Sequence, residues 1–230
     1  MSTESFLSLL QFSDGLFPAG AYAHSFGLEY YVQCGQVHDA DGVCNFIRAN
    51  LEGSLAPMET VAMLTALRCV LRNGDLAALL ILDKQLEAMK PVEELRCASR
   101  QMGRQMIRIA AELTQDRLLR TYFQATESDS TPGHYSVCFG VIAGSLGWPE
   151  ADAARAFLFS ATSAMVGAAL RLLPLGQLRG QRILWEMKPA IERLAHEATA
   201  KEASEMWSFV PGLEIASMRH ARLDARLFRS

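Results

Sequence analysis

The sequence predicts an all-α protein that folds as one globular domain. Apolar residues recur every three or four positions along most of the 230-residue chain, which places them on one face of a helix. Alternating runs of β-branched and aromatic residues, which indicate strands, do not occur. Prolines, glycines and polar stretches separate roughly ten helical segments, without a fixed repeat or an interdomain linker. We therefore expect residues 1–230 to form a single helical domain, with residues 212–230 as a short C-terminal interaction tail.

The first half of the chain contains the clearest helix start signals. Asp39 or Asp41 caps one predicted helix and Asp75 another, because an aspartate side chain accepts hydrogen bonds from free N–H groups of the first turn. Pro57 falls in the first turn of a further helix, which we therefore expect to begin separately from the segment before it. The predicted helical segments are residues 4–11, 26–35, 43–51, 59–71, 75–90 and 91–116.

The second half of the chain alternates breakers with long helices. Residues 126–133 are rich in Ser, Thr, Asp, Pro and Gly and form the clearest loop. The helix that follows carries Gly140 and Gly144, small residues that allow another helix to pack closely. Pro174 and Pro189 interrupt the helical pattern further on. The predicted helical segments are residues 134–146, 150–171, 176–198 and 213–224.

Arg96, Arg100, Arg104 and Arg108 recur every four residues on the longest predicted helix of the first half and therefore share one face. Basic faces on helices are commonly solvated. The alternative is a docking surface for an acidic partner, and the sequence leaves both interpretations open.

The N-terminal loop, residues 12–29, is unlike the rest of the sequence. It contains three glycines, a proline, a tyrosine, a histidine and two carboxylates, next to apolar runs. Pro18 cannot continue a helix, and the glycines on either side of it permit positive φ. The chain is expected to make an irregular turn here and to restart a helix near His24 or Ser25. Such a loop is either a buried structural corner or a recognition surface.

The C-terminal tail, residues 212–230, also departs from the usual pattern. Chain ends are commonly poorly ordered, but this one keeps apolar side chains beside four arginines almost to its last residue. A segment of this kind is expected to bind either the body of its own chain or another protein. The apolar side chains are Ile215, Met218, Leu223, Leu227 and Phe228, and the arginines are Arg219, Arg222, Arg226 and Arg229.

Composition narrows the possible partners. Hydrophobic residues make up 50% of the chain and charged residues 20%, and the net charge is −3, which argues against bulk affinity for nucleic acid or an anionic membrane. The mean hydropathy is slightly positive, +0.09. This value fits either an Ala- and Leu-rich helical core or some apolar surface that a partner protein covers.

The same chain shows features of a cytoplasmic protein. The five cysteines form no C-x-x-C pair, as in proteins of a reducing compartment. No basic segment precedes an apolar run near the first residue, so we expect no signal peptide. The longest apolar stretch, residues 156–170, is interrupted by polar residues and is expected to be a buried helix rather than a membrane span.

No group of residues in the sequence predicts a catalytic, metal or cofactor site. The segment Ala23–Gly27 is similar to the nucleophile turn of serine hydrolases around Ser25, but it lacks the first glycine and a preceding strand. Glu192 and His196 lie four apart and could hold half a metal site, although an ordinary surface pair is the simpler interpretation. No pair of carboxylates stands out for acid–base catalysis. We therefore expect binding surfaces rather than a reaction centre.

Several blocks of the sequence resemble the urease accessory proteins of the UreF family. They occur in the order that the family has and span nearly the whole chain. The blocks are residues 12–29 of the N-terminal loop, Arg100–Arg104 (RQMGR), Leu172–Gln177 (LLPLGQ), Gln181–Leu184 (QRIL), Ile215–His220 (IASMRH) and Arg226–Ser230 (RLFRS).

The resemblance implies an all-α protein that is not an enzyme, holds no cofactor of its own and forms a homodimer in the cytoplasm. Members of the family assist the incorporation of nickel into apo-urease. They bind a UreD- or UreH-type accessory protein and the GTPase UreG, which they recruit and regulate. For the dimer interface, the candidates are the small-residue helix at 136–147 and the helix after Glu150.

Under this resemblance, the N-terminal loop and the tail become the predicted partner-binding site. We expect the tail to become ordered on binding the UreD-type partner, through few and large anchors, because ordering costs conformational entropy. The loop is expected to meet the tail and to help shape the surface for the GTPase. The predicted partner-binding residues are Tyr22, His24, Ser25 and Glu29 in the loop, and Met218, Arg219, His220, Arg226, Leu227 and Phe228 in the tail.

Two other classes of function remain open. A direct nickel-binding metallochaperone would carry the metal on His24, His38 or His220. A helical enzyme acting on its own rests only on the hydrolase-like turn around Ser25, and the lack of any predicted strand counts against it.

Overall fold

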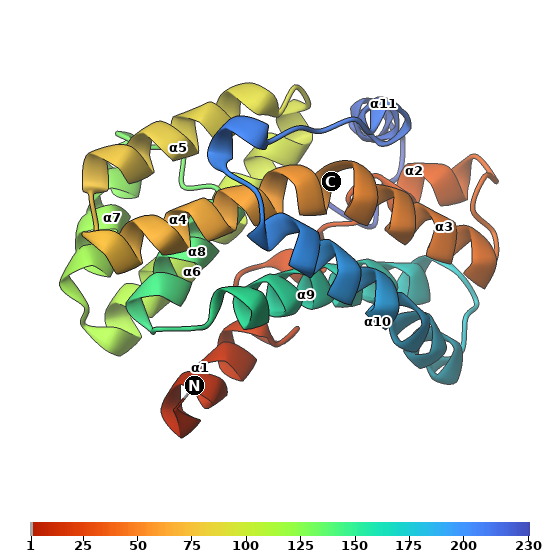
Figure 1. Cartoon of the computed structure of the whole chain (residues 1–230). Helices are drawn as coiled ribbons and strands as arrows, with labels where there is room; N and C mark the ends of the chain where they lie inside the picture. Colours follow the sequence, from red (N-terminus) through yellow and green to blue (C-terminus); the bar gives the residue numbers. More distant parts are fainter. Residues whose placement is uncertain (1) are drawn as a thin grey trace.

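The computed structural model describes residues 2–230 and confirms the all-α prediction, because this range contains helices and connecting segments but no β-strand. Figure 1 shows the helices packed into one body, with both chain ends on it. The helices are α1 (Thr3–Ser13), α2 (Leu28–Gln33), α3 (Ala40–Asn50), α4 (Val61–Arg72), α5 (Leu76–Met89), α6 (Glu93–Thr114), α7 (Arg117–Glu127), α8 (Tyr135–Ser145), α9 (Glu150–Leu172), α10 (Gln177–Thr199) and α11 (Pro211–His220). Short 3-10 turns lie at Ala21–Ala23 and Ala203–Glu205.

Helix α8 forms the centre of the core, packed against α4 and α6. Every residue from Ser136 to Gly144 is buried. A Cβ atom on Gly140 would collide with the backbone oxygen of Met63 in α4. The glycine is therefore required for the close approach of the two helices, as the small residues predicted. The helix at 136–147 was also one of two candidates for the dimer interface, and its residues from Ser136 to Gly144 offer no exposed surface for such a contact.

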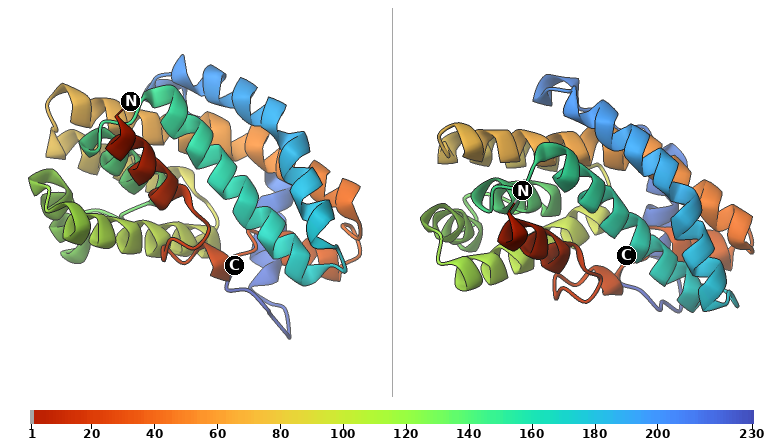
Figure 2. Two further views of the ribbon diagram at one scale, coloured as in Figure 1. Left: turned by 90° about the horizontal axis from the view of Figure 1, so that it is seen from below. Right: turned by 60° about the horizontal axis from the view of Figure 1, so that its bottom comes forward.

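Helices α9 and α10 pack against each other along one side of the body, as the two views of Figure 2 show. Helix α1 lies across α9. The indole N–H of Trp148, just before α9, donates a hydrogen bond to the Ser8 hydroxyl in α1 (2.9 Å), and the ring packs on Phe12. The first helix is thus attached to the body by a buried aromatic cluster.

The expected break at Pro57 does not occur. Helices α3 and α4 are joined by a π-helical segment, Leu51–Thr60, so the chain is helical from Ala40 to Arg72. Proline lacks an N–H, and the wider π turn accommodates it while other donors reach the free carbonyl groups. Phe209 N–H donates to the Gly53 carbonyl oxygen (2.8 Å), and the Thr60 hydroxyl donates to that of Leu55 (2.8 Å).

Of the other predicted helix ends, the two aspartate caps are confirmed and two others differ from the structure. Asp39 and Asp75 cap α3 and α5, with side-chain oxygens that accept N–H groups of the first turn. Pro189, however, lies inside α10 without ending it. The helix expected at 213–224 instead occupies Pro211–His220, and the chain continues from there without regular structure.

The arginine row of α6 is neither fully solvated nor free for a partner. Arg96 donates to the carbonyl oxygen of Lys90 (2.6 Å), and Arg104 to that of Pro132 (2.9 Å). Arg108 is exposed. Arg100 pairs with Glu87 of α5 (3.2 Å). Two of the four arginines therefore fasten neighbouring loops to α6, and a third pairs with the adjacent helix.

Two helices are long and apolar enough to cross a membrane by length and composition alone, Ala40–Arg72 and Glu150–Leu172. Within the most apolar window of each, 56% and 50% of the residues are buried inside the fold. Core helices of soluble proteins have this arrangement, since their apolar faces pack against other helices.

Candidate functional site

The N-terminal loop makes its sharpest turn at Phe26 and Gly27, which have φ values of 53° and 86°. The left-handed region suits glycine, and at Gly27 an added Cβ would also lie 2.9 Å from the Ser217 hydroxyl in α11. The turn directs the chain into α2 and presses its backbone against the start of the tail. The loop is thus a structural corner that is built against residues nearly two hundred positions away.

The last residues of the chain are hydrogen-bonded to this turn. The backbone oxygen of Ser230 accepts from the N–H groups of Ser25 (2.5 Å) and Phe26 (3.1 Å) and from the Ser25 hydroxyl (2.9 Å). Arg229 N–H donates to the carbonyl oxygen of Ala23 (2.8 Å). Figure 2 shows the chain end beside the loop in both views. The end of the tail is therefore fastened to the edge of the loop by backbone hydrogen bonds.

Glu29 joins loop and tail through its carboxylate. Its two oxygens accept the backbone N–H groups of Leu227 (2.7 Å) and Phe228 (3.0 Å). One of them also lies 2.9 Å from Nε2 of His220. On the other side of the ring, Nδ1 lies 2.9 Å from the carboxylate of Glu94 in α6. A carboxylate only accepts, so the protonated ring can donate to both groups at once.

The contacts between loop and tail shift the pKa values of Glu29 and His24. Burial by itself would raise the pKa of Glu29, but the N–H groups of Leu227 and Phe228 and the His220 ring together hold it below its ordinary value. Burial, with a smaller contribution from the Arg229 guanidinium, lowers the pKa of His24 to about 4. His24 is therefore neutral at pH 7, where its Nδ1 lies 2.8 Å from the Ser230 hydroxyl oxygen.

Arg171 at the end of α9 contacts both the loop and the tail. Its guanidinium carbon lies 3.8 Å from the ring centroid of Tyr22 and 4.0 Å from that of Phe228. It also donates to the carbonyl oxygen of Tyr22 (2.5 Å). Cation–π contacts with these two rings link the loop, the tail and helix α9.

The structure brings all ten predicted partner-binding residues to one place, in two sets. His24, Ser25, Glu29, His220 and Phe228 are buried and form the contacts between loop and tail, which we call the seam. The other five, which we call the rim, are exposed residues of the same loop and tail. The rim consists of Tyr22, Met218, Arg219, Arg226 and Leu227, of which Tyr22 is 73% and Leu227 62% exposed.

The burial of Ser25 removes the serine-hydrolase interpretation. Its hydroxyl donates to Ser230 and accepts from the N–H of Glu29 (3.3 Å), so it is a structural group. No strand precedes it within residues 2–230. The nucleophile turn of serine hydrolases follows a strand, which the predicted all-α fold does not provide, and the all-α prediction is confirmed.

Sequence reasoning missed Glu94 and Arg171. Glu94 binds His220 and also pairs with Arg226 (3.1 Å), and Arg171 stacks on Phe228. Each partner is more than fifty residues away in the chain. No local pattern marks either residue, because one reads as an ordinary acidic residue in the first turn of a helix and the other as an ordinary basic residue in the last turn.

The three histidines named for direct metal binding do not form a common site. His24 and His220 are buried and hydrogen-bonded within the seam, and His38 is exposed beside Asp39. Among residues 2–230, no group of three or more His, Cys, Asp or Glu side chains is placed to hold a metal ion. Glu192, the other candidate, pairs with Arg155 (2.7 Å).

Comparison with known proteins agrees with the resemblance that the sequence motifs indicate. The UreF family model matches residues 37–188. The chain is 34% identical to the urease accessory protein UreF of Bacillus sp. (strain TB-90), over 97% of this chain and 98% of that protein. It is 32% identical to UreF of Trichodesmium erythraeum (strain IMS101), over 96% and 95% of the two chains, and 34% identical to UreF of Paenarthrobacter aurescens (strain TC1), over the full length of both. Taken with the all-α fold, these matches show that the chain belongs to the UreF family of urease accessory proteins.

Proposed function

We propose that this protein assists the maturation of urease as a non-enzymatic scaffold. In this proposal it binds a UreD- or UreH-type accessory protein, recruits and regulates the UreG GTPase, and so supports nickel insertion into apo-urease. It works in the cytoplasm as a homodimer. Family membership supports the role in urease maturation, since the curated relatives carry the name urease accessory protein.

The observation that carries the scaffold proposal is the rim. Met218 and Leu227 are apolar and 49% and 62% exposed, and Arg219 and Arg226 lie beside them. Large apolar side chains next to arginines are the usual composition of an interface centre. The seam beneath holds their backbone in place, so less conformational entropy is lost when a partner binds.

The structure also changes how the tail acts in this proposal. Under the family resemblance we expected the tail to become ordered on the UreD-type partner, whereas here Phe228 is buried against its own chain and Leu227 is exposed. We therefore propose that the partner binds a tail that is already positioned. Tyr22 is 73% exposed and shares the Arg171 guanidinium with Phe228, so a second protein such as the GTPase could contact both loop and tail there.

The test is size-exclusion chromatography with light scattering of this protein, its UreD-type partner and the GTPase. Removal of all residues after Pro211 would also expose Glu29 and would damage the loop, so single rim variants are more informative. We expect Met218→Ala and Leu227→Ala to weaken co-elution with the UreD-type partner by about tenfold each, as for interface anchors. Leu178→Ala, at an equally exposed leucine of α10, is the matched control.

Two results would contradict the proposal. One is a ternary complex that forms with unchanged affinity when both Met218 and Leu227 are alanine. The other is equal weakening by Leu178→Ala, which would mean that any loss of exposed apolar surface has this effect.

A further inference from the structure

A cavity of about 120 Å³, partly open to solvent, lies next to the seam, and Phe26 of the N-terminal loop is among its lining residues. The π-helical segment forms one wall. Residues of the N-terminal loop, of the connection between α5 and α6, of α6 and α9, and of the segment that leads into α11 form the others. Its lining is mostly apolar and includes Met58, Met102, Phe157, Met165 and Leu213. Methionine side chains adapt to the shape of a ligand, and π-helical segments are frequent at binding sites.

One side of the cavity carries a buried ion pair. The Lys90 ammonium contacts the carboxylate of Glu59, and the second oxygen of that carboxylate accepts from the Ser136 hydroxyl (2.7 Å). Both charged residues are less than a tenth exposed. Burial lowers the pKa of Lys90 to about 7, while direct contact with Glu59 stabilises the ammonium form. Both oxygens of Glu59 are therefore occupied within the protein, one by Lys90 and the other by Ser136.

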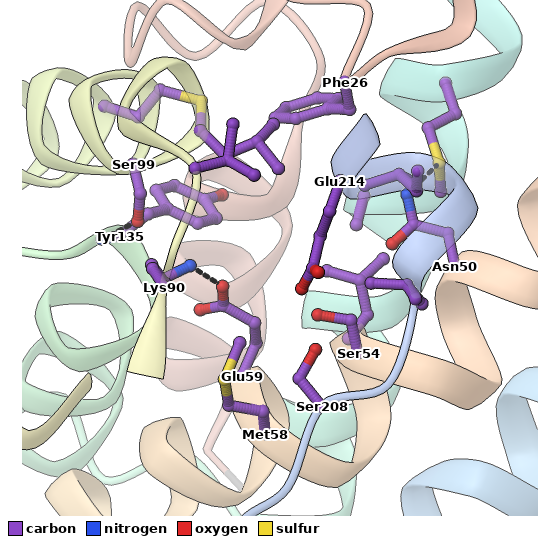
Figure 3. A pocket seen from close by; sticks show the side chains of 18 of the residues that line it. Phe26, Asn50, Ser54, Met58, Glu59, Lys90, Ser99, Tyr135, Ser208 and Glu214 are labelled. Carbon is purple, nitrogen blue, oxygen red and sulfur yellow. Dashed lines mark hydrogen bonds and ion pairs between the residues drawn. The ribbon is translucent and has the colours of Figure 1, made fainter. Parts of the chain in front are cut away.

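The opposite side carries a carboxylate without such a partner. Figure 3 shows Glu214 directed into the cavity, with the hydroxyl groups of Ser54 and Ser208 on the same side, across from Lys90 and Glu59. Within residues 2–230, these three side chains form no hydrogen bond or ion pair with one another or with any other group. Glu214, Ser54 and Ser208 are partly exposed, so this side of the cavity offers a ligand one carboxylate and two hydroxyl groups that have no partner in the described part of the protein.

We propose that this cavity binds a small organic primary ammonium compound. Its ammonium group has three N–H donors, which match the Glu214 carboxylate and the two serine hydroxyls. Its apolar part lies among the methionines and Phe157. An apolar cavity of about 150 Å³ in another protein holds benzene, so a ligand with roughly one ring or a short branched chain fits here. Since Glu59 already has Lys90 and Ser136 as partners, the ammonium group lies at the Glu214 side.

Ligand-observed NMR titration of the full chain with three probes of similar size tests the proposal. We expect benzylamine to bind, benzyl alcohol to bind about tenfold more weakly because it lacks the charge, and benzoate to bind least. Glu214→Gln keeps the shape of the side chain and should weaken benzylamine by about tenfold or more, without affecting benzyl alcohol. Glu112→Gln, at an exposed glutamate of α6, is the control.

A second pair of variants locates the bound probe. Ala161 lines the cavity from α9, and Ala161→Leu should fill it and abolish benzylamine binding. Ala151→Leu, in the first turn of the same helix and away from the cavity, should not. Circular dichroism verifies that both variants are folded. Equal binding of benzylamine and benzyl alcohol, or benzylamine binding that survives both Glu214→Gln and Ala161→Leu, would overturn the proposal. Neither result depends on whether the protein binds its urease-related partners.

Discussion

Two buried contact regions in this protein differ in chemistry, since one is apolar and the other polar. The contact between α4 and α8 is apolar and so close that Gly140 has no room for a Cβ atom against the backbone of Met63. The seam between loop and tail is polar, and Glu29 and His220 carry much of it through hydrogen bonds. Both regions join segments far apart in the sequence, and both are buried.

The difference indicates a division of roles. Close apolar packing does not respond to protons, and it tolerates no added atoms. Hydrogen bonds between charged groups weaken when a proton is gained or lost, and they can be exchanged for others of the same kind. The α4–α8 contact is therefore suited to fixing the fold, and the seam is suited to holding a surface that other proteins bind.

The largest effect should come from the apolar contact. Gly140→Ala places a methyl group against the backbone of α4 and should lower the free energy of unfolding by about 3 kcal/mol. Gly167→Ala is the matched control in α9, where no atom lies within 4 Å of the added Cβ, and it should stabilise the protein by up to about 1 kcal/mol. Urea unfolding followed by circular dichroism measures both. Similar values for the two would mean that the glycine is not needed for packing.

In the seam, Glu29→Ala should have the next largest effect. It leaves the N–H groups of Leu227 and Phe228 and the His220 ring without their acceptor, which should cost about 2 kcal/mol. Because only the tail is released, amide exchange at Leu227 and Phe228 should rise far more than exchange in α8. Glu112→Ala serves as the control. Unchanged protection of these two amides in Glu29→Ala would show that the carboxylate does not hold the tail.

The sequence predicted features well where the interacting residues are close together in the chain, and poorly where they are far apart. Gly140 and Gly144, and the caps Asp39 and Asp75, act within a turn or along one helix face, so they could be recognised without the structure. At Pro57 a local rule failed. The π-helical turn and the N–H of Phe209, more than 150 residues away, accommodate the proline inside one continuous helix.

The seam shows the other limit. The sequence marked its residues as unusual, and the family resemblance grouped them, but neither separated Phe228, which is buried, from Leu227, which is exposed. The chain bends at Leu227 and Phe228 so that both N–H groups reach Glu29, and the Phe228 ring packs on Arg171. Only the folded chain supplies that information.

A smaller effect is expected from pH, which should change the stability of the seam more than that of the α4–α8 contact. His24 has a pKa of about 4 in the folded protein and an ordinary value of 6.5, so its neutral form stabilises tail docking fully above pH 6.5. This stability is lost as the pH falls from 6.5 toward 4, by about 1 kcal/mol at pH 5.5. Glu29, whose pKa is lowered, adds a further loss below its ordinary value of 4.5.

Amide exchange at Leu227 and Phe228 between pH 7.5 and 5.5, corrected for the intrinsic rates, measures this loss. The protection of amides in α4 and α8 should change much less over the same range. His24→Asn should flatten the dependence for the tail. A pH response that is unchanged in this variant would assign the titration to another group.

The smallest effect on stability should come from Leu227→Ala. The side chain is 62% exposed, and alanine keeps the backbone N–H that Glu29 accepts, so we expect a change within about 0.5 kcal/mol. Urea unfolding gives this value, and the same variant is the one expected to lose partner binding. A destabilisation well above 1 kcal/mol would place Leu227 in the seam, and weaker partner binding could then reflect a released tail. A stable variant that no longer binds would mean that the two sides of the same segment serve different purposes, one for the fold and one for the partner.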